Sequence, residues 1–459
     1  MMKIQFRNSC FIIFCSCFFY ISATAQTTDS LSIDTTSTIK KEKRKTGWGF
    51  GALPAVSYNT DVGLQYGGLV NLYYYGDGSK YPEYLHSIYL EWSTTTKGSG
   101  TKRFFYDSKH LIPGIRLTTD LSYLTEQALD FYGFNGYQST YNTSFENDAS
   151  SKYISRMYYK HERKMLRIKT DFQGRFKGSY FGWLAGYTHI NININTVDID
   201  KLNKGKNESD KLPDTLLLYD KYVDWGIITP KEANGGINNF VHAGLVYDSR
   251  NNEPNPMKGI WTELIVSTAP KALDNNEYHF TKLAVIHRQY FTLISEKLSF
   301  AYRLSYQGTI SGKAPFYLQT NLLTSYMRGS TSEGLGGSRS LRGILRNRIV
   351  GDDIAFGNAE FRWKFWQGNI RKSNVYLALN PFIDAGKVIK EIPVDETLLP
   401  ATEDPSNYFD RKSDALHICY GMGLHIAINQ NFIIACEYGL ANDKRDGRIG
   451  LYIALNFLF

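Results

Sequence analysis

Apolar and polar residues alternate with a period of two in stretch after stretch of this chain. In residues 298–307, Leu, Phe and Tyr occupy the even positions, whereas the odd positions hold Ser, Ala, Arg and Gln. Residues 353–365 and 415–426 repeat this alternation. Because successive side chains of a β-strand point to opposite faces, the pattern predicts strands with one apolar and one polar face. About sixteen such stretches lie between residues 47 and 459, each near the length of a strand that crosses a membrane.

The apolar faces are too many and too aromatic for a soluble core. The chain holds 33 Tyr and 27 Phe, and aromatic residues make up 15% of it. A soluble β-sandwich, the alternative interpretation, would also alternate, but its apolar faces are shared between two sheets. After residue 25 no apolar run approaches the roughly 18 residues of a membrane helix. A sheet in lipid must close so that no edge stays unpaired. We therefore predict an all-β transmembrane antiparallel barrel of sixteen strands; fourteen or eighteen remain open because residues 153–175 are long enough to hide a hairpin.

The N-terminus has the layout of a secretory signal. Lys3 and Arg7 precede an apolar run over residues 10–21, and Ala23-Thr24-Ala25 supplies a small-residue cleavage site. We predict a signal peptide over residues 1–25 and, because residues 26–46 are mostly polar, a flexible periplasmic tail there. The barrel is then expected over residues 47–459, with its long connections (125–152, 194–236 and 310–352) on the outer side.

Charge and cysteine content narrow the function classes. The formal net charge of +8 falls to +6 once Lys3 and Arg7 leave with the signal, and the basic residues are scattered, so nucleic acid is not an expected partner. Two cysteines remain. Cys419 falls on the polar face of its stretch and Cys436 on the apolar face of the next, so we expect them to stay unlinked.

One polar stretch is more specific than an ordinary outer loop requires. It is residues 336–344, Gly-Gly-Ser-Arg-Ser-Leu-Arg-Gly-Ile. It resembles the loop motif of the BamA/TamA-like bacterial surface antigen superfamily. Further similar segments occur in the family's order: Leu53-Pro54 with Gly63 to Gly68, Tyr247 to Arg250 through Asn255-Pro256 to Gly259, Asn358 to Arg362, and Phe382 to Gly386. The resemblance spans residues 47–459 and implies a barrel in the outer membrane of a Gram-negative bacterium, with this long loop folded into the lumen.

The resemblance also implies an ion pair inside the barrel. Alternation places Asp384 on the polar, lumen-facing side of its stretch. The family pattern pairs the Arg of the Arg342-Gly343 motif with this carboxylate, and Glu360 on the neighbouring stretch is a second candidate acceptor. A guanidinium can bind a carboxylate through two parallel hydrogen bonds. Most family members follow Arg-Gly with an aromatic residue, whereas this chain has Ile344.

The two ends of the barrel carry further signals. Gly47, Gly49 and Gly51 are expected to weaken the first strand, so that its seam with the last strand is the least secure pairing. The last stretch ends in Phe457 and Phe459, placed by alternation on the outward face. Ending on Phe resembles the C-terminal signal by which outer-membrane barrels are recognised for insertion.

The resemblance implies assistance in inserting or translocating proteins, or other substrates, at the outer membrane. The 21-residue tail is too short for even one of the periplasmic POTRA repeats that the best-known members carry, so we expect a barrel-only form. The alternative is a binding or structural barrel whose outer loops engage a surface partner or ligand. Outer-membrane lipid is an expected partner, and periplasmic or outer-membrane assembly proteins are candidates.

Enzymatic chemistry finds no support. His417 and His425 share the lumen face, but eight residues of strand separate them by roughly 27 Å, too far to share a metal ion. No cofactor motif and no nucleophile-base pair is evident. We expect neither a cofactor nor an enzyme.

Overall fold

The computed structural model describes residues 44–59, 63–81, 83–253, 255–273, 278–321, 334–370, 373–428, 432–455 and 458–459. The predicted signal peptide and residues 26–43 of the predicted tail lie outside these ranges. Arg44–Phe459 forms one compact unit. Within the described part of the chain, no helix is long and apolar enough to cross a membrane.

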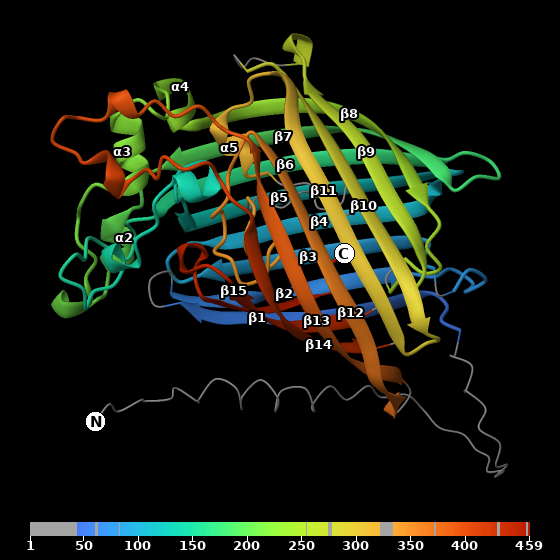
Figure 1. The fold of residues 1–459 in the computed structure, drawn as a ribbon. Coiled ribbons are helices and arrows are strands. Elements are labelled where there is room, and N and C mark those ends of the chain that lie inside the picture. The colour runs from blue at the N-terminus through green and yellow to red at the C-terminus, as the bar shows by residue number, and fades with distance from the viewer. Residues whose placement is uncertain are drawn as a thin grey trace, which may run out of the picture. The chain divides into compact units, whose positions relative to one another are not determined.

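The unit is built on one sheet of sixteen strands, shown in Figure 1, in which each strand pairs with its neighbours in the sequence. Every ladder is antiparallel. The strands are β1 (Trp48–Asn59), β2 (Gly63–Tyr74), β3 (His86–Thr95), β4 (Gly100–Ile112), β5 (Ile115–Asp130), β6 (Lys160–Arg175), β7 (Phe181–Asn195), β8 (Gly235–Asp248), β9 (Gly259–Ala269), β10 (Phe280–Ile294), β11 (Leu298–Gly312), β12 (Asp353–Ile370), β13 (Ser373–Lys390), β14 (His417–Ile428), β15 (Phe432–Ala441) and β16 (Ile449–Leu455).

Helices occur only in the connections of the described chain. The α-helices are α2 (Ile199–Asn203), α3 (Leu218–Asp224), α4 (Pro230–Ala233) and α5 (Phe316–Gln319). The 3-10 turns are η2 (Gly136–Gln138), η3 (Thr143–Phe145), η4 (Glu208–Asp210), η5 (Lys271–Leu273), η6 (Glu396–Leu398), η7 (Pro405–Asn407) and η8 (Lys444–Asp446).

The predicted strand count is confirmed, and the doubtful region is resolved. Residues 153–175 hold no hairpin, because β6 begins only at Lys160. The expectation of strand over residues 153–159 is wrong. Tyr158 and Tyr159 are instead buried in a cluster of loop aromatics, and this packing outweighs the extended propensity that aromatic residues have.

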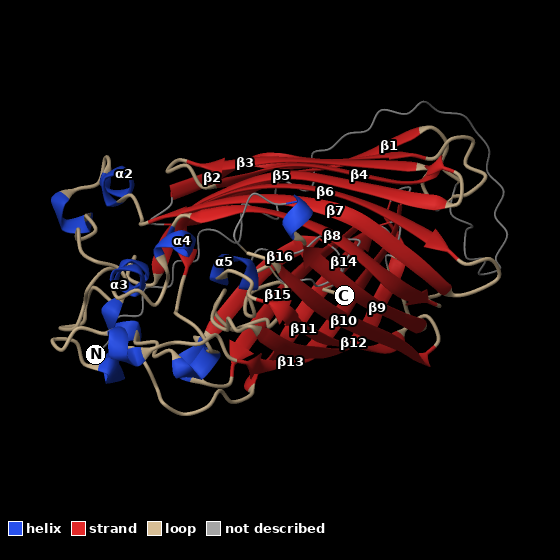
Figure 2. Cartoon of the chain, turned by 90° about the horizontal axis from the view of Figure 1, so that it is seen from above, coloured by secondary structure: helices blue, strands red, loops and turns tan. Residues whose placement is uncertain are grey.

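The two faces of the sheet differ as the alternation predicts. On β11, Leu304 is 57% exposed and points outward, while Arg303 beside it is fully buried on the inner face. On β12, Trp363 is 49% exposed and Glu360 is buried. Figure 2 shows the strands curving around so that their inner faces look toward one another. The outward face is therefore the apolar one, and the inward face carries the charges.

The two cysteines of the described chain are free, as expected. Cys419 on β14 is fully buried on the inner face, and Cys436 on β15 is half-buried. In the ladder between these strands Cys419 lies opposite Ala441 and Cys436 opposite Leu424, so the thiols occupy different rungs.

Long connections gather at one end of the sheet and short turns at the other. At the long-loop end, segments between β5 and β6, β7 and β8, β11 and β12, and β13 and β14 share one aromatic cluster. Phe131 meets Tyr219 and Tyr222 edge to face at ring distances of 5.4 and 5.3 Å. Arg348 ties the β11–β12 loop to the β5–β6 loop by donating to the carbonyls of Gly136 (2.8 Å) and Ser139 (3.0 Å). The loops therefore pack as a single cap.

Candidate functional site: a loop arginine inside the sheet

Residues 334–352, in the connection between β11 and β12, turn inward and place Arg342 against the inner face of the sheet. Its guanidinium donates to both carboxylate oxygens of Asp384 on β13, from Nε at 2.9 Å and from Nη2 at 2.8 Å. The backbone N–H of Arg342 donates to the same carboxylate at 3.0 Å. Both side chains have zero exposure. The resemblance and the alternation thus pointed to two residues that the structure brings into bidentate contact.

Two more carboxylates share the same guanidinium. Arg342 Nη1 donates to Glu360 on β12 at 3.0 Å and to Glu437 on β15 at 2.7 Å. Glu360 also accepts from Arg362 at 2.8 Å, so the cluster is a network rather than a pair. Sequence reasoning missed Glu437. The parity of β15, which turns Cys436 and Tyr438 outward, was the signal that could have found it.

The ring of Phe382 completes the pocket around the cation. The central guanidinium carbon of Arg342 lies 3.6 Å from the centroid of this ring, within the range of a cation–π contact. Burial opposes the charged form, but the carboxylates of Asp384, Glu437 and Glu360 outweigh it and hold the pKa of Arg342 well above its usual value. The arginine is therefore a fixed positive charge with partners on β12, β13 and β15.

Gly343 brings the loop backbone against the last two strands. Its N–H donates to the hydroxyl of Tyr452 on β16 at 3.0 Å. Its φ of +108° lies in the region that favours glycine. A Cβ here would lie 2.7 Å from backbone atoms of Gly439 and Leu440 on β15. The facing residue of the sheet, Gly439, must also lack a side chain, because a Cβ there would lie 2.4 Å from the carbonyl oxygen of Arg342.

Apolar residues anchor the loop on either side of the motif. Leu341 and Ile344 are buried in a cluster with Phe356, Val388 and Cys419 from the strands. Ile344, which stands where most family members carry an aromatic residue, is 1% exposed. The aliphatic side chain therefore packs at this position, and the loop covers the thiol of Cys419.

His417 and His425, which the alternation places on the inner face, have separate partners. His417 contacts Asp414 at 2.9 Å and Asp446 at 2.7 Å, which ties together the segments before β14 and before β16. His425 lies 3.6 Å from Glu437. Among the described residues no group of three metal-binding side chains is close enough to hold an ion.

The first and last strands form no ladder with each other in the described chain, where pairing runs from β1 through to β16. Gly49 and Gly51 lie in β1, and Gly47 precedes it with a φ of +63°. β16 is the shortest strand of the sheet as described, with seven residues. The glycines therefore lie at the β1 edge of the sheet, and β16 is its other edge.

Phe459 does not continue the outward face of the last strand, and that expectation is wrong. β16 ends at Leu455, and Phe459 is 3% exposed, packed against Tyr290 and Ala301 on the inner face. Its main-chain oxygen accepts from Arg362 at 2.7 Å. An aromatic ring at the end of a short strand gains more from burial beside Tyr290 than from following the alternation. Phe457 lies outside the described residues.

Comparison with known proteins identifies a matching family. The model of the Omp85 superfamily domain matches residues 97–452. Among solved structures, the chain is similar to BamA from Haemophilus ducreyi lacking POTRA domains 1–3, with 14% identity over 89% of this chain and 69% of that one and a TM-score of 0.48. It is also similar to CdiB from Escherichia coli, with 10% identity, 88% and 61% coverage and a TM-score of 0.48. No curated protein sequence matches the chain.

Proposed function

The chain belongs to the Omp85 superfamily of outer-membrane barrels, which is involved in protein insertion or translocation, and from this premise we propose that the barrel itself assists insertion or translocation of proteins by opening at its seam. The sheet is a sixteen-stranded barrel of the bacterial outer membrane, and barrels of this family are not enzymes. Because such barrels keep short turns in the periplasm, we assign the short-turn end to that side.

The observation that carries the proposal is where the Arg342 loop docks. The Arg342-Gly343 motif contacts β12, β13, β15 and β16, through Glu360, Asp384, Glu437 and Tyr452. All four strands lie on one side of the seam, next to the edge of β16. The motif therefore braces the C-terminal side of the seam. Arg346, further along the same loop, binds Glu126 and Asp130 on β5, so β1 is not among the strands that these contacts hold. This arrangement favours opening between β1 and β16 over opening elsewhere in the wall.

Depletion of the protein tests the function at the level of its products. We expect the outer membrane to lose a defined subset of proteins, which quantitative mass spectrometry of purified outer membranes would identify. Re-expression of the intact chain should restore them. An unchanged inventory would instead favour the alternative function, a binding barrel whose outer loops engage a surface partner.

Locking the seam tests the opening directly. We expect a disulfide between β1 and β16 to abolish the rescue, because the first and last strands could no longer part. A scan of cysteine pairs, one within residues 49–55 and one within residues 450–453, in a background with Cys419→Ala and Cys436→Ala, would find a pair that closes. Rescue should return on reduction. Full rescue by the oxidised, locked barrel would eliminate lateral opening.

A further inference from the structure

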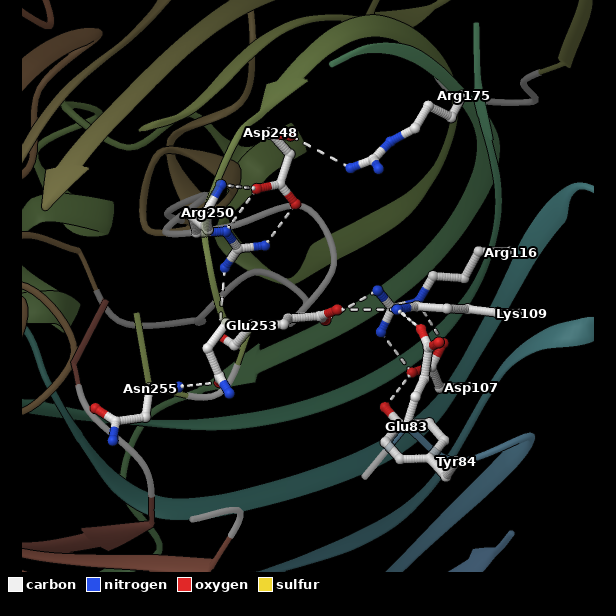
Figure 3. Close-up of polar contacts among 11 residues, drawn as sticks. Glu83, Tyr84, Asp107, Lys109, Arg116, Arg175, Asp248, Arg250, Glu253 and Asn255 are labelled. Atoms are coloured by element: carbon white, nitrogen blue, oxygen red, sulfur yellow. Dashed lines mark hydrogen bonds and ion pairs between the residues drawn. The ribbon is translucent and has the colours of Figure 1, made fainter. Parts of the chain in front are cut away.

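The turn between β8 and β9 does not simply reverse the chain. Residues 249–253 and 255–258 lie at the periplasmic end, and Figure 3 shows the side chain of Glu253 extended toward Arg116 on β5 and Lys109 on β4. Glu253 accepts from Arg116 Nη1 at 2.9 Å and from Lys109 Nζ at 3.2 Å. Neither partner is on a strand that pairs with β8 or β9. The turn therefore contacts strands that are not its neighbours in the sheet.

Arg116 and Lys109 are also held by partners other than Glu253. Arg116 also binds Asp107, from Nε at 2.6 Å and from Nη2 at 2.5 Å, and Tyr84 donates to the same carboxylate. Lys109 binds Glu83 at 2.5 Å. Both cations thus have a second carboxylate besides Glu253: Asp107 on β4 for Arg116, and Glu83 in the connection between β2 and β3 for Lys109. Loss of Glu253 would leave them paired and the wall intact.

The turn is stiffened by its own hydrogen bonds. Arg250 makes two contacts to Asp248, both at 2.9 Å, and its guanidinium lies 3.7 Å over the ring of Trp261. The side-chain oxygen of Asn251 accepts from the backbone of Met257 and of Lys258, each at 3.1 Å. A turn held in this way presents Glu253 in one position rather than sampling many.

Its far side touches the opposite part of the wall. Lys364 Nζ on β12 lies 3.4 Å from the sulfur of Met257, and Thr292 on β10 donates to the carbonyl of the same residue at 3.0 Å. β5 and β12 are seven positions apart in the order of sixteen strands, so the turn links nearly opposite sides.

We propose that the described residues 249–253 and 255–258 form a strap across the periplasmic mouth of the lumen, latched by Glu253 to Arg116 and Lys109 and able to swing away from the wall when that latch breaks. It is a second barrier, in series with the Arg342 loop. A polypeptide segment that enters the lumen from the periplasm must displace it. The strap is independent of the proposed function, since it restricts entry whatever the barrel acts on.

The latch is ionic and partly accessible, which sets how it opens. The side chain of Glu253 is 36% exposed. Burial raises the pKa of Glu253, but the positive charges of Arg116, Lys109 and Arg250 lower it by more. The pKa of this carboxyl therefore lies well below its usual value. A carboxyl group whose pKa is lower in the folded than in the unfolded protein stabilises the fold at pH values above its unfolded-state pKa. This stabilisation is lost as the pH falls through the folded-state pKa. Mild acid should therefore leave the latch closed, whereas high salt should weaken it by screening.

Trypsin accessibility of the purified full-length barrel measures the latch. Cleavage after Arg250, whose side chain is 3% exposed, requires the strap to leave the wall. We expect Glu253→Gln to raise that cleavage rate about fivefold, the effect of losing two partly exposed ion pairs. Glu253→Lys should raise it further, because a like charge then faces Arg116 and Lys109. Salt near 1 M should bring the wild type toward Glu253→Gln, and pH 5 should not.

The matched control is Glu296→Gln, the same change at an exposed carboxylate in the turn between β10 and β11. Planar-bilayer conductance gives a second measurement. With Arg342→Ala already present, Glu253→Gln should raise conductance further, and Glu296→Gln should not. A change in electrophoretic mobility between unheated and heated samples would verify that each variant is a folded barrel. Cleavage rates and conductance equal for Glu253→Gln and Glu296→Gln would overturn the strap.

Discussion

Replacing Arg342 with alanine is expected to release the loop from the inner face and to expose Cys419. The change leaves Asp384, Glu360 and Glu437 buried without the cation that they share. Breaking a buried ion pair by removing one partner typically costs about 3–5 kcal/mol, far more than the same change at a surface. Because Arg342 and Asp384 have zero exposure, the larger figure applies.

The native thiol reports the release without an added probe. Cys419 is fully buried and packs in the same cluster as Leu341 and Ile344. In a Cys436→Ala background, labelling by a water-soluble maleimide should be slow in the wild type. It should accelerate by at least about 100-fold in Arg342→Ala, since labelling tracks the open population and about 1.4 kcal/mol corresponds to tenfold. Arg411→Ala, which removes an exposed loop cation, is the matched control.

The double-mutant cycle separates the network from a simple pair. Asp384→Ala leaves Arg342 with Glu360 and Glu437, so its effect should be smaller than that of Arg342→Ala. The double variant should be no worse than Arg342→Ala alone. Strictly additive changes in labelling would mean that the two residues act separately. Wild-type labelling in Arg342→Ala would show that apolar contacts alone hold the loop.

Period-two alternation was enough to predict the wall of the barrel. Each strand needs only its own sequence to decide which side chains face lipid, so Asp384 and Glu360 could be placed on the inner face without the structure. The same parity also turns Glu437 inward. Its role could not be foreseen because nothing local says which inward carboxylates meet one cation. That depends on the loop path, and hence on contacts between residues far apart in sequence.

The connections were less predictable for the same reason. Tyr158 and Tyr159 were predicted to lie in a strand, but they are buried in the aromatic cluster of the cap. The connection containing Glu253 reverses the chain between β8 and β9, but it also carries Glu253 to Arg116 on β5. Its reach to Arg116 follows from the curvature of the wall, which no local pattern encodes. Phe459 departs from alternation because its ring packs against Tyr290 and Ala301 on the inner face.

Gly343→Ala is expected to undock the loop although it removes no charge. A φ of +108° costs any L-residue roughly 1 kcal/mol, and the new methyl group would meet backbone atoms of Gly439 and Leu440 at 2.7 Å. Backbone in a paired strand cannot move aside as a flexible side chain can, and overpacking of this kind typically costs a further 1–3 kcal/mol. The sum is about 2–4 kcal/mol, so Cys419 labelling should rise by about 30- to 1000-fold.

Gly205→Ala separates backbone strain from close approach. Gly205 has a φ of +77°, and a Cβ there would meet nothing within 4 Å. It therefore carries a similar conformational cost without the clash and should label like the wild type. Gly439→Ala creates the same clash from the sheet side, because its Cβ would lie 2.4 Å from the carbonyl oxygen of Arg342. It lacks the positive φ, so its labelling should rise above the wild type but less than that of Gly343→Ala. If Gly343→Ala and Gly205→Ala labelled at the same rate, the loop would not need its close approach to β15, and the ion network alone would hold it in the lumen.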